Sequence, residues 1–262
     1  GKKYQVIGQG LLGGGFATLY FSVFAAGILY AKLSMPIAFL LMCLITLAAG
    51  LLSIRVNSML VAIFGIIGGY VTPIILHAPN PNLVVFYSYL LVLSLGIFFI
   101  GHKKQWRLLN YLGFLFTYAL FLMSLVNYDK SNFKITFLFI TLYFLVYSSL
   151  VYLYNLQTKT KSTVLEVSQL ILNAGVFTAV GYLLINDMFG RPYPALLTIG
   201  LAVYYIFHFY LFVTKKYKDK NLAISFLALT SFFVVFSVPL ILEKESLTIV
   251  WSLQALLFIW LG

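Results

Sequence analysis

The chain has 262 residues, of which 62% are hydrophobic and 9% are charged. A soluble fold of this length cannot bury so much apolar surface, because the surface of a domain shrinks only slowly relative to its volume. The formal charge of +11 comes from basic residues in short clusters between apolar runs. That pattern is typical of membrane-protein loops and argues against nucleic acid as a partner, so composition predicts an integral membrane protein.

Apolar runs long enough to cross a bilayer follow one another along the chain. A bilayer core needs about 20 residues of helix, and runs such as 35–47 are apolar on every face, unlike a barrel strand. We therefore expect an all-α polytopic bundle with about ten transmembrane helices, in a single transmembrane domain over residues 1–262. The expected spans are 6–30, 35–54, 57–77, 82–101, 106–126, 134–154, 164–185, 193–213, 221–241 and 246–262.

Linkers of a few residues make neighbouring spans antiparallel hairpins. The division between the second and third spans depends on Arg55 and Asn57. Ten spans also divide into five and five, and an odd-numbered repeat gives inverted halves. Residues 1–128 and 129–262 are therefore candidate pseudo-repeat halves, although no residue-level similarity connects them. The chain begins without Met and ends inside an apolar run, so we expect a fragment whose partners include the remaining helices of a longer chain or other membrane proteins.

The basic residues divide unequally between the two sides of the membrane that these spans define. Twelve lie on one side: Lys2, Lys3, Arg55, Lys103, Lys104, Arg107, Lys159, Lys161, Lys215, Lys216, Lys218 and Lys220. Five lie on the other: Lys32, Lys130, Lys134, Arg191 and Lys244. Because the richer side is cytoplasmic, we expect a bacterial inner membrane protein with a cytoplasmic N-terminus. Its lipid partners are then the bilayer and the anionic lipid headgroups at the cytoplasmic face.

Glycines four residues apart recur in the first and third spans. Gly10 and Gly14 lie in GLLGG, and Gly65 and Gly69 lie in GIIGG. Glycines at this spacing share one helix face and let another backbone approach closely, which predicts helix packing. The alternative interpretation is a substrate path lined by bare backbone.

The third span also contains a potential helix break. Pro73 has no N–H, so the carbonyl of Gly69 loses its helical partner, and Gly68 next to it offers no resistance to bending. Thr72 supplies a hydroxyl that can bond a freed carbonyl. We expect this segment to be kinked or unwound and to border any cavity in the protein. A plain kink and a transporter binding site are the two interpretations.

Polar residues inside the spans are few. Gln169 and Asn173 lie four apart in the seventh span, so they either form interhelical hydrogen bonds or make a polar patch that faces a cavity. All six acidic residues fall in loops or at span ends, which argues against a carboxylate relay. The sequence contains no phosphate-binding loop, nucleophile motif or metal-ligand spacing. We expect no catalytic residues, no cofactor and no metal, and therefore not an enzyme.

Aromatic residues are abundant, with 19 Tyr and 25 Phe. Such residues collect at membrane interfaces and face lipid. We expect most of them there, and the three histidines near span ends. Trp106, beside Lys103, Lys104 and Arg107, is placed to touch lipid headgroups.

Three stretches resemble an uncharacterised bacterial family of predicted membrane proteins, domain of unknown function 2339. They are 13–30 (GGGFATLYFSVFAAGILY), 55–76 (RVNSMLVAIFGIIGGYVTPIIL) and 251–262 (WSLQALLFIWLG). The resemblance implies no established activity. Members are similar in having more spans than this chain and an N-terminal polar segment, which implies a fragment. It also implies Glu where this chain has Gln254, which puts any role of an acid there in doubt.

These features lead to three hypotheses about function. The first is a transport-like or permease-like role for an unidentified solute, which a polar cavity open to one side would favour. The second is a non-catalytic membrane scaffold or assembly partner of a cell-envelope complex, which a dry bundle would favour. The third is an intramembrane transferase on lipid-linked substrates, which needs an acid, base or metal cluster.

Overall fold

The computed structural model describes residues 2–76, 82–158, 161–214 and 219–242, together with residues 251, 252, 255, 256 and 259. This part of the chain is helical and contains no strand, so the all-α prediction is confirmed. The chain divides into two units, unit 1 (Gly1–Tyr128) and unit 2 (Asp129–Gly262). Their boundary coincides with that of the candidate halves. That the units are repeats stays a prediction.

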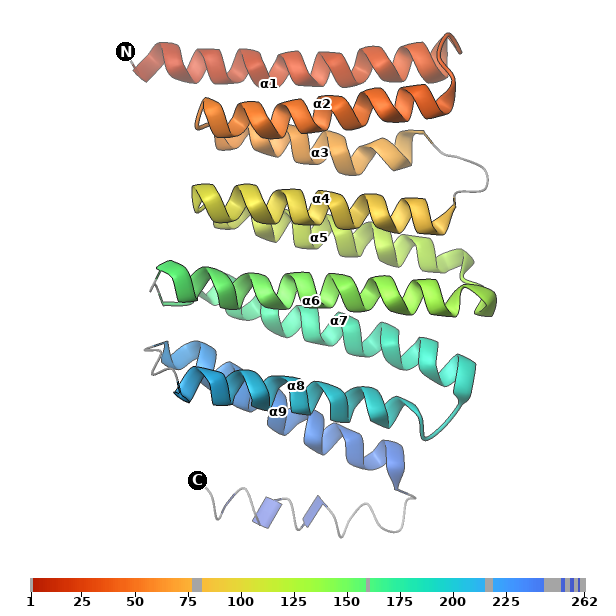
Figure 1. The fold of residues 1–262 in the computed structure, drawn as a ribbon, viewed down its shortest axis with the longest axis vertical. Helices are drawn as coiled ribbons and strands as arrows, with labels where there is room; N and C mark the ends of the chain where they lie inside the picture. Colours follow the sequence, from red (N-terminus) through yellow and green to blue (C-terminus); the bar gives the residue numbers. More distant parts are fainter. Residues whose placement is uncertain are drawn as a thin grey trace. The chain divides into compact units, whose positions relative to one another are not determined.

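Unit 1 is built from five described helices that run back and forth in antiparallel order (Figure 1). A π-helical turn, Ala25–Leu29, continues the first helix, and a 3-10 turn, Leu125–Asn127, follows the fifth. The helices are α1 (Lys2–Phe24), α2 (Met35–Arg55), α3 (Met59–Ile75), α4 (Leu83–Lys104) and α5 (Arg107–Ser124).

The turns of unit 1 have local chemical causes. Asn57 has a left-handed backbone with φ of 50°, which asparagine tolerates, and it separates α2 from α3 where the sequence predicted. Ser58 then caps α3 by accepting from the N–H of Val61, and Asn82 caps α4 in the same way. Gln105, with φ of 57°, ends α4. The Asn57 and Gln105 turns therefore form the short α2–α3 and α4–α5 hairpins at one end of unit 1.

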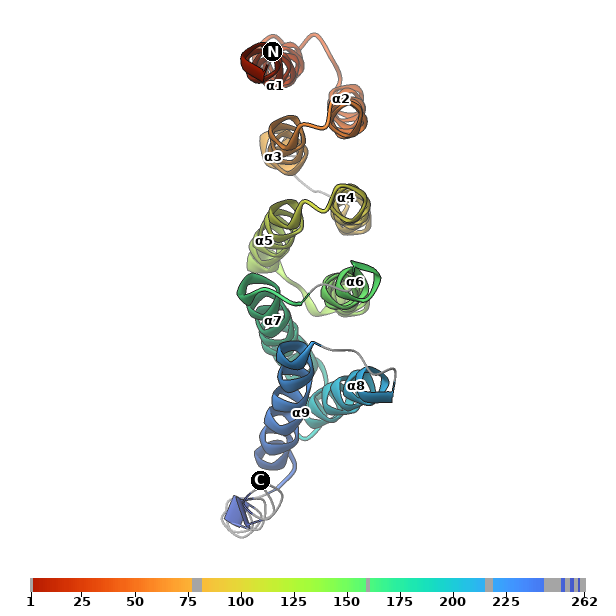
Figure 2. The same cartoon turned by 90° about the vertical axis from the view of Figure 1, so that its left-hand side faces the viewer.

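Helix α3 is the centre of unit 1, because it contacts each of the other four helices. In the end-on view, α1, α3 and α5 form one row, and α2 and α4 form the other (Figure 2). Phe16 of α1, Ala49 of α2 and Val61 of α3 form one buried apolar cluster. Ala38, Met42 and Leu76 form a second cluster toward the opposite end of α2 and α3.

The described part of unit 2 up to residue 242 contains four helices. A 3-10 turn, Lys130–Asn132, precedes them. The helices are α6 (Phe133–Thr158), α7 (Val164–Phe189), α8 (Pro194–Thr214) and α9 (Lys220–Ile241). Helix α7 contacts α6, α8 and α9, and α8 packs extensively on α9. The most buried helix of unit 2 is therefore the one that carries Gln169 and Asn173.

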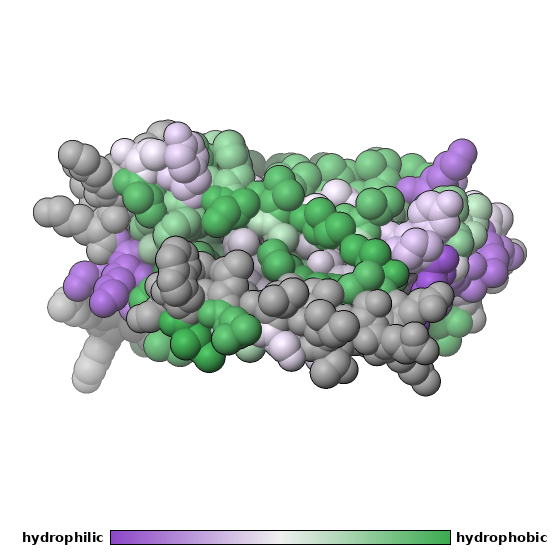
Figure 3. All heavy atoms as spheres, turned by 90° about the horizontal axis from the view of Figure 1, so that it is seen from below, coloured by the Kyte–Doolittle hydropathy of each residue, from purple (hydrophilic) through white to green (hydrophobic). Residues whose placement is uncertain are grey.

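Helix lengths agree with a membrane environment. Eight described helices are long and apolar enough to cross a bilayer. One face of the molecule is apolar across its middle and hydrophilic toward both ends (Figure 3). Helix α3 is shorter, with 17 residues, and reaches about 26 Å, at the lower limit for a span. The tenth expected span, 246–262, lies largely outside the described residues.

Many tyrosines lie inside the helix bundle, where the sequence analysis did not place them. Tyr70, Tyr87, Tyr143, Tyr147 and Tyr205 are among the largest fully buried side chains. For these residues the expectation of interface belts and lipid-facing positions was wrong. In lipid a buried tyrosine combines a large apolar ring with a hydroxyl that can bond a neighbouring helix.

Candidate functional site

The segment around Pro73 is helical, so of the two expected forms, kinked or unwound, the unwound one is wrong, and the kink stays a prediction. Helix α3 is continuous from Met59 to Ile75 with Pro73 inside it. The Gly69 carbonyl, which Pro73 deprives of its helical partner, accepts a hydrogen bond from the Tyr89 hydroxyl of α4 at 2.7 Å. Thr72 donates at 2.7 Å to the Gly68 carbonyl, which Pro73 does not free, so this bond is not the one that the sequence predicted for its hydroxyl. A neighbouring helix therefore repairs the break that proline introduces.

Neighbouring helices also enclose this segment. A Cβ atom at Gly68 would collide with the ring of Tyr20 in α1. A Cβ at Gly69 would lie 2.9 Å from Cγ2 of Thr46 in α2 and 3.3 Å from Leu93 in α4. These contacts show packing where the sequence also allowed a cavity. That Gly68, Gly69, Thr72 and Pro73 border a cavity stays a prediction.

The two glycine pairs differ in their surroundings. Gly65 packs against α2, where an added Cβ would lie 2.8 Å from the Cβ of Ala49. Gly10 and Gly14 are exposed, and an added Cβ at either would meet nothing within 4 Å. The glycine of α1 that does pack is Gly13, whose Cβ would lie 2.7 Å from the ring of Phe64. Packing of Gly10 and Gly14 against a further helix stays a prediction.

A chain of hydroxyls joins α3, α4 and α5 in the interior of unit 1. Tyr70 bonds Thr117 at 2.7 Å, and Thr117 bonds Ser94 at 2.9 Å. Ser94 donates to the Leu90 carbonyl at 2.8 Å, so its own proton is used. With Ser94 as that donor, Thr117 donates to Ser94 and Tyr70 donates to Thr117, and the Tyr70 hydroxyl also lies 3.3 Å from the Gly113 carbonyl. Each of these three hydroxyl protons therefore has an acceptor.

The same arrangement recurs elsewhere in unit 1. Tyr20 of α1 bonds Thr46 of α2 at 2.7 Å, and Thr46 donates to the Met42 carbonyl. Tyr87 of α4 bonds Ser124 of α5 at 3.0 Å, and Ser124 donates to the carbonyl three residues earlier. In each case a small hydroxyl residue passes its proton to its own helix and accepts one from a tyrosine. These contacts link neighbouring helices by hydrogen bonds that lipid cannot replace.

Unit 2 gathers polar side chains between α6, α7 and α8. Asn173 of α7 donates from Nδ2 to the Phe144 carbonyl of α6 at 3.0 Å. Tyr204 of α8 donates to Ser148 of α6, one turn further along, at 2.9 Å. The ring of Phe144 packs against both Tyr204 and Tyr205, with centroids 5.3 and 6.4 Å away. We name Ser148, Gln169, Asn173, Tyr204 and Tyr205 the α6–α8 polar cluster.

Two members of this cluster are buried without a hydrogen-bond partner among the described residues. They are Nε2 of Gln169, whose residue is 4% exposed, and the hydroxyl of Tyr205, which is 0% exposed. Ser148, which accepts from Tyr204, also lies within reach of the Tyr205 hydroxyl. Tyr205 lies about 16 Å along α8, near the middle of that helix. A buried unpartnered donor destabilises a fold by about 1–3 kcal/mol. The sequence predicted Gln169 and Asn173 here, but not Ser148, Tyr204 or Tyr205.

The missed residues carried only a weak sequence signal. Tyr204 and Tyr205 lie in an aromatic run that reads as lipid-facing bulk, and Ser148 is one small hydroxyl among many. His208 bonds the Tyr204 carbonyl through Nδ1 at 2.8 Å, one turn beyond the cluster. Only the packing of α8 on α6 shows that these side chains meet. No group of three or more metal-ligand residues was found among the described residues.

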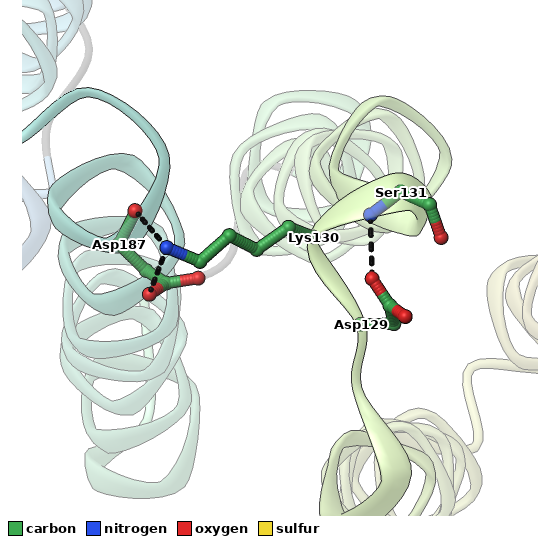
Figure 4. A network of polar contacts seen from close by, with 4 residues as sticks. All are labelled: Asp129, Lys130, Ser131 and Asp187. Atoms are coloured by element: carbon green, nitrogen blue, oxygen red, sulfur yellow. Dashed lines mark hydrogen bonds and ion pairs between the residues drawn. The ribbon is translucent and has the colours of Figure 1, made fainter.

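The ends of unit 2 carry charged contacts of two kinds. At the end where α6 begins and α7 finishes, Lys130 bonds the carboxylate of Asp187 at 3.0 Å and its carbonyl at 2.9 Å (Figure 4). Asp129 accepts from the N–H of Ser131 beside it. The side chains of Lys130 and Asp187 are 61% and 43% exposed. This pair therefore lies in the interface region rather than in the interior.

At the other end, two buried carboxylates hold helix N-termini. Asp219 caps α9 and also accepts from the N–H of Ser162, which precedes α7, at 2.5 Å. Glu166 and Thr163 form a reciprocal capping box at the start of α7. Asp219 and Glu166 are 7% and 8% exposed. Their position at helix ends is as predicted, and their negative charge suits the positive end of the helix dipole.

Comparison with known proteins gives one match. A family model with the description predicted membrane protein, DUF2339, matches residues 1–262. The suggested resemblance is therefore confirmed over the whole chain. No curated protein and no solved structure gives a match.

Proposed function

Because the chain belongs to DUF2339, a family of predicted membrane proteins, we propose a transport-like or permease-like role in which unit 2 contacts the solute. The contact site is the α6–α8 polar cluster. The solute is a small polar or amphipathic molecule that accepts a hydrogen bond from the Gln169 amide and exchanges one with Tyr205. Tyr205 lies near the middle of α8, and transporters have their binding sites near the middle of the membrane, which supports this choice.

One observation carries this proposal: the α6–α8 polar cluster contains two buried donors, Gln169 Nε2 and the Tyr205 hydroxyl, without a hydrogen-bond partner among the described residues. Nearly all buried polar groups in folded proteins are bonded, so each exception calls for an explanation. An amide in α7 and a hydroxyl in α8 that remain unpaired favour a function that uses them. The ring of Phe144, which packs against Tyr205 and stacks on Phe177 with centroids 4.4 Å apart, supplies apolar contact for an amphipathic solute.

The scaffold hypothesis remains the alternative. The complete hydroxyl chain of unit 1 and the central packing of α3 support a rigid body rather than a moving one. A membrane scaffold needs nothing more than that from unit 1. The transferase hypothesis has no comparable support, because the described residues supply no cluster of catalytic acids or bases to act on a substrate.

The proposed location is the bacterial inner membrane, with the N-terminus and the basic loops at the cytoplasmic face. Within each unit, contacts between loops support the alternation of spans on which this rests. Lys104 bonds Asn57 at 3.0 Å, which joins the α2–α3 and α4–α5 turns. Asp219 joins the α6–α7 and α8–α9 turns. An impermeant thiol reagent should label Ser131→Cys, and not Lys103→Cys, in intact cells that carry Cys43→Ala.

The experiment that separates transport from scaffold uses two matched serines. Ser148 in unit 2 and Ser94 in unit 1 are both buried, and each bonds a hydroxyl of a neighbouring helix. Serine to cysteine is nearly isosteric, so either variant should fold. In a Cys43→Ala background, a small cationic methanethiosulfonate reagent should modify Ser148→Cys in native membranes and leave Ser94→Cys unmodified.

A polar path to the cluster predicts a modification rate at position 148 at least about tenfold above that at position 94. Equal and very slow modification at both positions would contradict the transport proposal and favour the scaffold. Equal and fast modification would mean that unit 1 is as open as unit 2, and the assignment of the site to unit 2 would fail. The unmodified Cys43→Ala parent supplies the background rate.

A further inference from the structure

Unit 1 is basic and lacks acidic residues altogether. Its seven cationic residues are Lys2, Lys3, Lys32, Arg55, Lys103, Lys104 and Arg107, whereas all six Asp and Glu residues follow residue 128. Unit 2 therefore contains all six acidic residues and the remaining ten basic residues. No carboxylate side chain within unit 1 can neutralise its cations.

Four of these cations lie at two adjoining turns, where Arg107 begins α5 and the other three end helices. Arg55 ends α2, and Lys103 and Lys104 end α4. The hydrogen bond from Lys104 Nζ to Asn57 Oδ1, at 3.0 Å, holds the α2–α3 turn against the α4–α5 turn. Arg55 and Lys103 are exposed. We name Arg55, Asn57, Lys103, Lys104 and Trp106 the basic end of unit 1.

We propose that the basic end of unit 1 binds the phosphate of an anionic phospholipid. The turns lie at the ends of membrane-spanning helices, which is the depth of phospholipid phosphates. Trp106 is half-buried beside the lysines, and an indole ring favours this interface. The bond to Asn57 orients Lys104 without neutralising it, because an amide oxygen is uncharged. Because unit 1 supplies no carboxylate side chain to pair with these cations, they suit a negatively charged headgroup.

Helix ends alone do not account for the cluster. Cations in the last turn of α2 and α4 complement the negative ends of the helix dipoles, which carry about half a charge each. Three full positive charges exceed that amount. The turns of unit 2 that the sequence places on the same side carry six lysines together with the buried Glu166 and Asp219, whose oxygens accept backbone N–H groups, so only unit 1 has basic turns without a carboxylate. The lipid site of unit 1 does not depend on whether unit 2 carries a solute.

The test follows the fluorescence of Trp106 in a Trp251→Phe, Trp260→Phe protein. The protein is placed in nanodiscs of phosphatidylcholine with increasing brominated phosphatidylglycerol, whose bromine quenches a nearby indole. Brominated phosphatidylcholine in the same discs is the neutral comparison. Quenching by the anionic lipid should reach half its maximum at a mole fraction at least about tenfold lower than quenching by the neutral lipid.

Two triple variants identify the site. Arg55→Gln, Lys103→Gln, Lys104→Gln should abolish the preference for the anionic lipid. The control variant Lys32→Gln, Lys134→Gln, Arg191→Gln removes the same charge from other exposed positions, and it should retain the preference for the anionic lipid. If the first variant fails to fold, native mass spectrometry of Lys103→Gln should show fewer retained phosphatidylglycerol molecules than the parent. Retention equal to that of the parent would overturn the proposal.

Three results would overturn the site. They are no lipid preference in the parent, an equal loss of preference in both triple variants, and loss of preference in neither. Inorganic phosphate at about 10 mM should leave the preference unchanged, and full competition by it would identify a soluble anion rather than a lipid. None of these results depends on the modification of Ser148→Cys, so this proposal and the transport proposal can fail separately.

Discussion

The interiors of the two units differ in how their central hydroxyl groups are paired, although each unit also has a buried amide atom without a partner among the described residues, Asn110 Oδ1 in unit 1 and Gln169 Nε2 in unit 2. In unit 1 the hydroxyl chain from Tyr70 runs through Thr117 and Ser94 and stops at a backbone carbonyl, so each proton is used. In unit 2, Asn173 and Tyr204 find partners, but the Gln169 amide nitrogen and the Tyr205 hydroxyl do not. Both interiors are buried, and both lie among apolar helices.

This difference separates packing from binding chemistry. A completed chain orients the helices that it joins, and any removal leaves a buried group unpaired. An incomplete cluster contributes less to stability than it could, and it retains hydrogen-bonding capacity for another molecule. Unit 1 therefore behaves as the structural part of the chain, and unit 2 is where a solute is proposed to bind.

The largest expected effect tests the packing of unit 1. Gly69→Leu should lower the free energy of unfolding in detergent by about 3 kcal/mol or more, because the new side chain must enter the contact with Thr46 and Leu93. The measurement is unfolding monitored by circular dichroism. Gly175→Leu in unit 2 is the matched control, because an added Cβ there meets nothing within 4 Å.

Gly14→Leu extends that test to α1. Its Cβ meets no neighbour within 4 Å, so within this chain the substitution should be nearly silent. A loss comparable to that of Gly69→Leu would mean that another helix covers the Gly10 and Gly14 face in the protein as purified. A silent Gly69→Leu would contradict the packing described for α3.

The next effect compares one substitution in both units. Tyr70→Phe removes the donor at the head of the hydroxyl chain and should destabilise unit 1 by about 1–2 kcal/mol. Tyr205→Phe removes a buried hydroxyl without a partner among the described residues, so stability should be unchanged or raised. Equal destabilisation by both, in the same detergent titration, would abolish the contrast between the units.

A smaller effect concerns the repair at Pro73. Tyr89→Phe removes the donor to the Gly69 carbonyl and should cost about 0.6–1 kcal/mol. In a Pro73→Ala background the cost should shrink, because the alanine N–H restores a partner for that carbonyl. The coupling between the two positions is measured by a double-mutant cycle. A coupling of zero would show that Tyr89 does not compensate for the proline.

The smallest effect is expected at the surface of unit 2. Asp187→Asn weakens an ion pair whose side chains are 61% and 43% exposed, so the loss should stay below about 0.5 kcal/mol. Raising the salt concentration should reduce it further, because exposed pairs are screened. A loss above about 2 kcal/mol in the detergent titration would mean that the pair is buried in the membrane-bound protein.

The fold was predictable because lipid imposes it on each segment separately. A long apolar run must satisfy its own backbone, so helix type and approximate bounds follow from the sequence without knowledge of any neighbour. The end of α2 was predictable for the same reason, because Asn57 and Ser58 act on their own backbone. Gln169 and Asn173 were predicted as polar residues on one face of one helix.

Contacts between helices decided the rest. The sequence shows that Pro73 frees the Gly69 carbonyl, but only the packing of α4 on α3 shows that the Tyr89 hydroxyl donates a hydrogen bond to it. Repeated glycines look alike along the chain, yet Gly65 packs against Ala49 and Gly10 packs against nothing within 4 Å. Whether a buried hydroxyl has a partner depends on a residue far away in the chain, as with Tyr204 and Ser148. Local chemistry determines the helices, and only their packing determines which polar groups remain for function.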